Sequence, residues 1–152
     1  GILINGSSVS NYITRNSIYS NSGAGINIYS ETADNNYILT NNIYGRNQNH
    51  GIYLYSCDNI IIKKNFIYKN NYGIYHEDSV SLNRITQNEI YSKLNSGIEF
   101  YTTVTTTTGN FIKNNNIWGK NQNAGINIYN ADKNTMFSND IYNNNIYFLF
   151  CQ

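Results

Sequence analysis

The sequence contains no proline and little charge, and both absences narrow the possible folds. None of the 152 residues is Pro, so no strand loses a backbone donor to a pyrrolidine ring. Lys, Arg, Asp and Glu together make up only 12 % of the chain, and 31 Asn residues supply most of its polarity. The apolar residues are regularly spaced despite a mean hydropathy of −0.49, so we expect a folded core rather than disorder.

The chain also lacks a charge excess, a long apolar run and a cysteine framework. The formal net charge is +1 and the ten Lys and Arg are scattered along the sequence, which argues against a nucleic-acid partner. No apolar run approaches the ~20 residues of a membrane span. The first residue is Gly, and no signal peptide is visible. Two cysteines, Cys57 and Cys151, are too few to define a disulfide scaffold.

What the sequence does contain is a repeat, which is clearest between residues 51 and 72. Apolar side chains alternate with Tyr in the first part of this stretch, which is typical of a strand with one buried face. Two further short strands follow, each separated from the next by polar residues. The inward-facing side chains of the three strands are Ile52, Leu54, Ile60, Ile62 and Ile67. Three short strands and three polar corners predict one coil of a parallel β-helix.

The same columns recur along the whole chain at intervals of 20 to 28 residues. Strands open at Gly1, Gly25, Gly51, Gly73, Gly97, Gly125 and Asn145. A corner asparagine recurs at Asn16, Asn41, Asn65, Asn88, Asn115 and Asn139. Two residues later comes an isoleucine, at Ile18, Ile43, Ile67, Ile90, Ile117 and Ile141. Six copies in one register predict that like residues stack in vertical rows.

Each column has a physical reason. Branched side chains on the inward positions would fill a narrow interior. Asn at a corner tolerates left-handed backbone geometry, and stacked Asn amides can hydrogen-bond from coil to coil. Gly before the first strand fits a corner that needs either a positive φ or a close backbone approach.

The motif Asn-x-Ile-x-x-Asn-x-Ile-Tyr, followed by Gly-Ile-x-Ile, carries a family resemblance. It occurs at residues 11–19, 36–44 and 83–91, with Trp ending the copy at 110–118. It resembles the right-handed parallel β-helix repeat of pectate-lyase-like proteins and of the β-helix proteins that assist copper-site maturation in nitrous oxide reductase. The resemblance implies an all-β fold, a right-handed parallel β-helix (solenoid) of about six coils with three short strands per coil. We expect a single domain over residues 1–152, uncapped at both ends.

Candidate catalytic residues are few. His76, Glu77 and Asp78 form the only dense ionisable triplet, and we expect His76 in an inward column and Glu77 on the outside. Glu77 and Glu99 lie on neighbouring coils, two residues out of register, as a candidate carboxylate pair. The lyases that share the repeat would bring a calcium-binding Asp cluster, and no such cluster recurs here. We therefore expect no metal and no cofactor. A structural protein is the expectation that we favour over an enzyme.

Outward aromatic residues form two ladders that are candidate binding surfaces for carbohydrate or for a protein partner. One ladder comprises Tyr19, Tyr44, Tyr68, Tyr91, Trp118 and Tyr142, and the other comprises Tyr29, Tyr55, Tyr101 and Tyr129, interrupted by Glu77. Rings ~4.8 Å apart would form flat strips along the axis. Such strips stabilise the sheet by stacking, bind sugar rings face-on, or pack against another copy of the chain.

The apolar terminal segments favour self-association. The candidate end-to-end interface comprises Ile2, Leu3, Ile4, Ile146, Tyr147, Phe148, Leu149 and Phe150. Stacking of one chain on the next is a heterologous contact that generates a filament. We therefore expect an extracellular or cell-surface structural protein that associates with itself head to tail. The alternatives are a polysaccharide-binding or polysaccharide-processing module, and a fragment of a larger adhesin or phage tail protein.

Overall fold

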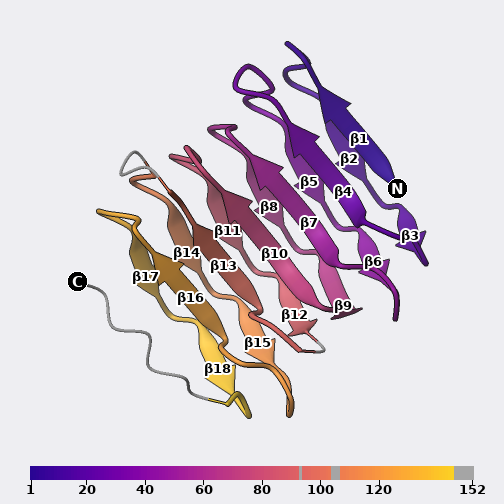
Figure 1. The fold of residues 1–152 in the computed structure, drawn as a ribbon, viewed down its shortest axis with the longest axis vertical. Coiled ribbons are helices and arrows are strands. Elements are labelled where there is room, and N and C mark those ends of the chain that lie inside the picture. Colours follow the sequence, from indigo (N-terminus) through magenta and orange to yellow (C-terminus); the bar gives the residue numbers. More distant parts are fainter. Residues whose placement is uncertain (93, 104–106, 146–152) are drawn as a thin grey trace.

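The computed structural model describes residues 1–92, 94–103 and 107–145, and within them the chain winds as a stack of coils. Eighteen strands within these residues form three six-stranded sheets, in which each strand pairs in parallel with its equivalents on the adjacent described coils. Each coil contributes one strand to each sheet, as Figure 1 shows from the first coil (indigo) to the last (yellow). This is the parallel β-solenoid that the repeat predicts.

The strands that follow the glycines form the first sheet, which we call sheet A. Its members in spatial order are β1 (Ile2–Asn5), β4 (Ala24–Tyr29), β7 (His50–Tyr55), β10 (Tyr72–Glu77), β13 (Ile98–Tyr101) and β16 (Ile126–Tyr129). Sheet B consists of β2 (Tyr12–Thr14), β5 (Tyr37–Leu39), β8 (Ile61–Lys63), β11 (Arg84–Thr86), β14 (Phe111–Lys113) and β17 (Thr135–Phe137). Sheet C consists of β3 (Ser17–Tyr19), β6 (Asn42–Tyr44), β9 (Phe66–Asn70), β12 (Glu89–Ser92), β15 (Asn116–Trp118) and β18 (Asp140–Tyr142).

The predicted isoleucine columns are the core. Ile67 pairs in register with Ile43 on one side and Ile90 on the other, and all three side chains are fully buried. Sheet A repeats this with Ile52 beside Ile26 and Ile74. Since each inward residue packs on its own counterpart, the interior is a set of aliphatic rows that run along the axis.

Three polar ladders run between these rows. At the corner between sheets B and C, Asn65 donates from both its backbone N–H and Nδ2 to Oδ1 of Asn88, at 2.9 and 3.0 Å. The same double donation joins Asn16, Asn41, Asn65, Asn88, Asn115 and Asn139 in order. A second ladder precedes sheet B at Asn11, Asn36, Asn83, Asn110 and Asn134, with Ile60 in place of an amide. A third follows sheet C at Asn21, Gln48, Asn70, Ser92, Gln122 and Asn144.

The position of the left-handed residue corrects one expectation. The corner Asn residues themselves do not adopt positive φ; the residue before each of them does, as at Arg15, Lys64 and Gln87, where φ is 55° to 58°. The turn places the strain on an exposed residue of variable type, so the Asn amide stays inside, where it bonds to the next coil. The asparagine column is therefore selected for hydrogen bonding rather than for backbone geometry.

The strand-opening glycines are explained by close approach and not by φ. A Cβ on Gly25 would lie 2.8 Å from the carbonyl oxygen of Gly51 and 2.6 Å from a methyl carbon of Ile43. Similar contacts surround Gly51, Gly73 and Gly97. No helix in the described part of the chain is long and apolar enough to span a bilayer.

Candidate functional site

Most neighbouring rings of the predicted aromatic ladders are stacked. Tyr19, Tyr44 and Tyr68 lie in one row on sheet C, with centroids 5.3 and 4.8 Å apart and planes within 13° of parallel. The row continues through Tyr91, Trp118 and Tyr142, whose successive centroids are 6.1 Å apart. On sheet A, Tyr29 stacks on Tyr55 at 4.4 Å and Tyr101 stacks on Tyr129 at 5.4 Å. Because the faces of neighbouring rings cover one another, these ladders present mainly ring edges and phenol hydroxyls to solvent.

The ionisable triplet does not converge on one point. Glu77 faces outward from sheet A and accepts a 2.6 Å hydrogen bond from the hydroxyl of Tyr53. Asp78 lies beyond the strand at φ 60° and accepts from the Thr103 hydroxyl at 3.0 Å. His76 points the opposite way, into the core. The three side chains therefore occupy three environments and do not form an acid–base constellation.

His76 occupies the inward column, as the register predicts. Its ring stacks on Phe100 at 4.1 Å, and Nδ1 lies 3.3 Å from the carbonyl oxygen of Glu99. Nε2 is buried without a hydrogen-bond partner among the described residues. Complete burial lowers the pKa of the imidazole to about 3, so His76 is a neutral core residue at physiological pH.

Sheet A carries an aromatic cluster that the sequence reasoning missed. The His50 ring lies 5.1 Å from the centroid of Tyr53, 5.2 Å from Tyr72 and 5.0 Å from Tyr75. Burial lowers the pKa of His50 to about 4, and burial also raises the pKa of Tyr53, with a further contribution from its bond to Glu77. His50 and Tyr72 pair across β7 and β10, just before the glycines, a column in which the repeat shows no constant residue type.

Glu99 lies beside this cluster, and it is the second carboxylate of the candidate pair. It pairs with Tyr75 while Glu77 pairs with Tyr101, so the predicted two-residue offset is confirmed. Burial raises the pKa of Glu99, and bonds from the Ser96 and Asn127 side chains oppose that shift. A hollow of about 400 Å³ opens next to Glu99, lined by Tyr72, Asn95, Ser96, Glu99, Asn123, Ala124 and Asn127.

Sheet B gathers cations that are far apart in the sequence. Lys63, Arg84 and Lys113 lie on its strands, and Arg15 and Lys64 follow them at the left-handed corner. No Asp or Glu lies on the strands of this sheet. A groove of about 420 Å³ on the first three coils is lined by Thr14, Arg15, Leu39, Thr40, Lys63 and Lys64. The basic residues are thus less scattered in space than along the sequence.

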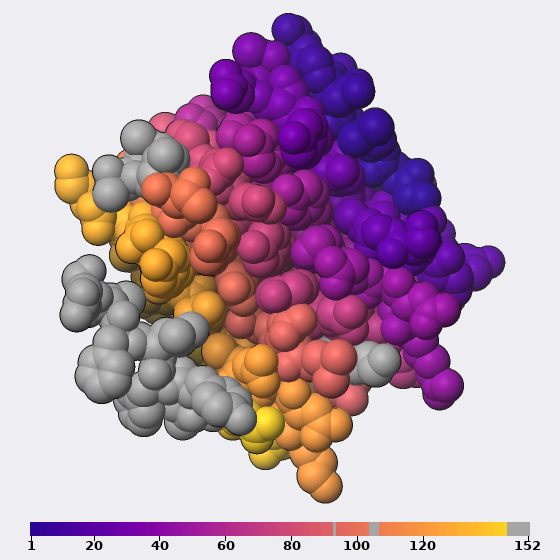
Figure 2. Space-filling view, in the orientation of Figure 1, coloured from indigo at the N-terminus to yellow at the C-terminus, as the bar shows by residue number. Residues whose placement is uncertain are grey.

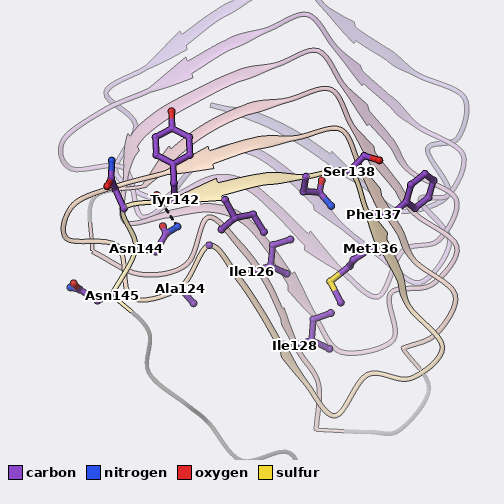
Figure 3. Close-up of a pocket in the computed structure, with 13 residues that line it drawn as sticks. Ala124, Ile126, Ile128, Met136, Phe137, Ser138, Tyr142, Asn144 and Asn145 are labelled. Atoms are coloured by element: carbon purple, nitrogen blue, oxygen red, sulfur yellow. Dashed lines mark hydrogen bonds between the residues drawn. The ribbon is translucent and has the colours of Figure 1, made fainter.

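The end of the stack after β16, β17 and β18 contains a hollow of about 700 Å³. In Figure 3, Ile126, Ile128 and Met136 point to the inside of the coil, and Phe137 and Tyr142 point away from it. Met136 and Ile141, which belong to the core columns, are 48 % and 45 % exposed here, although their counterparts in earlier coils are buried. This hollow is the open end of the aliphatic interior at the last described coil.

The predicted terminal residues are only partly described. At the N-terminal end Ile4 is buried, Ile2 is half-buried and Leu3 is exposed. Residues 146–150, the other half of the predicted interface, lie outside the described residues, as does Cys151. Cys57 is a free, buried thiol whose pKa is raised by burial.

In Figure 2 the coloured coils lie as successive bands, each against its neighbours.

Comparison with known proteins agrees with this architecture. A family model described as the right-handed beta helix region matches residues 1–151. No curated protein and no solved structure matches the chain.

Proposed function

The chain belongs to the right-handed β-helix family, and from that premise we propose that it associates head to tail with further copies of itself into a filament or sheath. The observation that carries this proposal is the direction of the polar ladders. In each ladder the residue of one coil donates to the side-chain oxygen of the following coil, as Asn88 does to Asn115. The two ends of the stack are therefore chemically different.

The last coil among the described residues presents donors. Asn139 is the last residue of its ladder, and Nδ2 of Asn134, the last of the second ladder, is buried with no hydrogen-bond partner among the described residues. The N-terminal end presents acceptors, because Asn16 and Asn11 are first in the same ladders and donate onward. A second copy placed on the end would bring Oδ1 of Asn11 and Asn16 to these donors.

The apolar rows are complementary in the same arrangement. Met136 and Ile141 at one end would continue onto Ile13 and Ile18 of the next copy, because each pair occupies equivalent columns. Burying two half-exposed aliphatic side chains and satisfying an orphaned amide both favour association. The contact is heterologous, so it extends without closing on itself.

Sedimentation velocity over a range of concentrations, followed by electron microscopy, tests this proposal. We expect the wild-type protein to form species whose size increases with protein concentration. In the electron microscope they should appear as rods with the width of a single solenoid. Met136→Lys introduces a charge at the end of the stack and should reduce association at least about tenfold. Leu82→Lys is the matched control, since Leu82 is an aliphatic residue 55 % exposed on the side of the stack.

The comparison of the two variants decides the outcome. Self-association through the end face is wrong if the wild type stays monomeric at high concentration, or if Leu82→Lys and Met136→Lys reduce association equally. Far-ultraviolet circular dichroism and the thermal midpoint would establish that both variants keep the fold. We also propose an extracellular or cell-surface location, the setting in which such a filament would act, and immunolabelling of unpermeabilised cells tests it.

A second candidate function is binding of an acidic polysaccharide, and the cation groove on sheet B supports it. Arg15, Lys63 and Lys64 line this groove with the hydroxyls of Thr14 and Thr40, and no carboxylate belongs to the lining. Affinity electrophoresis in gels containing polygalacturonate or neutral dextran tests it. We expect retardation by polygalacturonate alone, abolished by Lys63→Gln with Lys64→Gln. Equal mobility in both gels would reject it.

A further inference from the structure

The hollow beside Glu99 on sheet A has the chemistry of a cation site. Glu99 extends from β13 between Tyr75 of β10 and Asn127 of β16. Its carboxylate is withdrawn from water far enough for burial to raise its pKa. A partly buried carboxylate is stabilised best by a positive charge, because neutral donors compensate only part of its lost hydration.

The described partners of this carboxylate are all neutral. Ser96 and Asn127 donate hydrogen bonds to it, and the other described residues of the hollow are Tyr72, Asn95, Asn123 and Ala124. No Lys, Arg or His belongs to that lining. The volume of about 400 Å³ lies within the range of small-ligand sites. A ligand that enters it would therefore meet one negative charge, several amide and hydroxyl groups, and one aromatic wall.

The aromatic wall strengthens the preference for a cation. Tyr72 lies close enough to Glu99 for the carboxylate charge to contribute to the raised pKa of the phenol. The position of the ring is fixed by His50 at 5.2 Å and by an edge contact with Tyr75 at 4.9 Å. A positive group between a carboxylate and a tyrosine ring gains from both the charge and the ring quadrupole.

We propose that this hollow binds a primary ammonium group, such as that of an amino sugar or an alkyl diamine, with Glu99 as its counter-ion and Tyr72 as its wall. The amide oxygens of Asn95, Asn123 and Asn127 favour a primary ammonium over a quaternary one, because only the former has N–H groups to donate. The site lies on the side of the stack, so this inference does not depend on head-to-tail association.

Isothermal titration calorimetry with two matched pairs of probes tests the inference. Glucosamine has an amino group where glucose has one hydroxyl, and putrescine has two amino groups where 1,4-butanediol has two hydroxyls. We expect heat of binding from glucosamine, putrescine or both, and none from glucose or butanediol. The amine that binds with higher affinity shows whether the hollow favours an amino sugar or an alkyl diamine. Binding should weaken as ionic strength rises, since it depends on a charge pair.

Variants locate the site. Glu99→Gln keeps the shape of the side chain and should weaken amine binding about tenfold or more, because a charge-assisted bond becomes a neutral one. Glu89→Gln removes an exposed carboxylate from the neighbouring sheet C and should leave binding unchanged. Equal binding of glucosamine and glucose, binding of choline alone, or unchanged affinity in folded Glu99→Gln would overturn the proposal. If Glu99→Gln fails to fold, amine binding by the wild type that is insensitive to salt would overturn it equally.

Discussion

The side chain of Asn65 donates from Nδ2 to the backbone carbonyl of Ile38 in the preceding coil at 2.9 Å, while its Oδ1 accepts two bonds from Asn41. One amide thus satisfies backbone groups of its neighbours as well as another amide. Since all of these groups are buried, the corner depends on each member of the ladder.

Removal of one interior amide should therefore be costly. Asn65→Ala would leave the backbone N–H of Asn41 and one hydrogen of its Nδ2 buried without their acceptor, and we expect the free energy of unfolding to fall by about 3 kcal/mol. Asn16→Ala, at the exposed start of the same ladder, should lower it by less than about 1 kcal/mol. Urea denaturation of both variants measures the difference, and similar midpoints would contradict this role of the ladder.

A charge placed in the core column should be more damaging than the same charge beside it. Ile67→Asp puts a carboxylate at a fully buried position in the hydrophobic core cluster, and we expect a loss of several kcal/mol or failure to fold. Phe66→Asp is the control, because Phe66 precedes it in the same strand and faces outward. Comparable thermal midpoints for the two variants would mean that the register is wrong.

The strand-opening glycines should not accept a methyl group. In Gly25→Ala the new Cβ would meet Ile43, the Gln48 amide and the carbonyl of Gly51, all at 2.6 to 2.8 Å. Backbone cannot move aside cheaply, so we expect a loss of about 2 kcal/mol or more. Gly23→Ala, where no atom lies within 4 Å, should be neutral in the same melting experiment. A neutral Gly25→Ala would show that the coils can separate locally.

His76 should make the protein sensitive to acid. Its pKa is about 3 in the fold and near 6.5 when the chain is unfolded, so only the unfolded state takes up a proton as pH falls below about 6.5. The free energy of unfolding should then decrease by up to about 1.4 kcal/mol per pH unit toward pH 4. His76→Phe, which matches Phe100 in the next coil, removes that component.

The difference between wild type and His76→Phe isolates this residue from the other titrating groups. His50 also has a lowered pKa and contributes in the same direction, whereas Glu99 and Asp58 have raised pKa values and contribute in the opposite one. Denaturation of both proteins at pH 7 and pH 4 measures how much less unfolding free energy His76→Phe loses than the wild type. Parallel losses of stability in the two proteins would contradict the assignment.

The fold was predictable because the repeat dictates which residues share a column. The columns of Asn65, Ile67 and Tyr68 keep one register through all six coils, with Trp118 as the one replacement for Tyr, and alternation alone orients them. What the pattern could not give is the residue that bears the positive φ, since Arg15, Lys64 and Gln87 have no chemical feature in common. Left-handed geometry at those corners is imposed by the turn and is tolerated because the side chains are exposed.

The candidate sites were harder to predict, because they consist of residues that depart from the repeat. His50, Tyr53, Tyr72 and Tyr75 come from two columns on two coils, and neither column has a constant residue type along the repeat, so no periodic signal connects them. The Lys and Arg residues of sheet B are separated by 20 or more positions in most cases, and only the winding of the chain aligns them. A search for ionisable and aromatic residues on the same sheet of adjacent coils would have found both groups.

Each coil, counted from one strand-opening glycine to the next, bonds only to its immediate neighbours among the described residues. The number of coils can therefore change without a change of fold. Joining His50 directly to Gly73 would set Ile26 beside Ile74 and Asn41 beside Asn88, equivalents of the partners that each has now. It would also bring Asn36 next to Asn83 and remove the isoleucine that interrupts that ladder. Shortening or lengthening by whole turns therefore needs no compensating change elsewhere, which is how a family of rods with different reach can arise from one pattern.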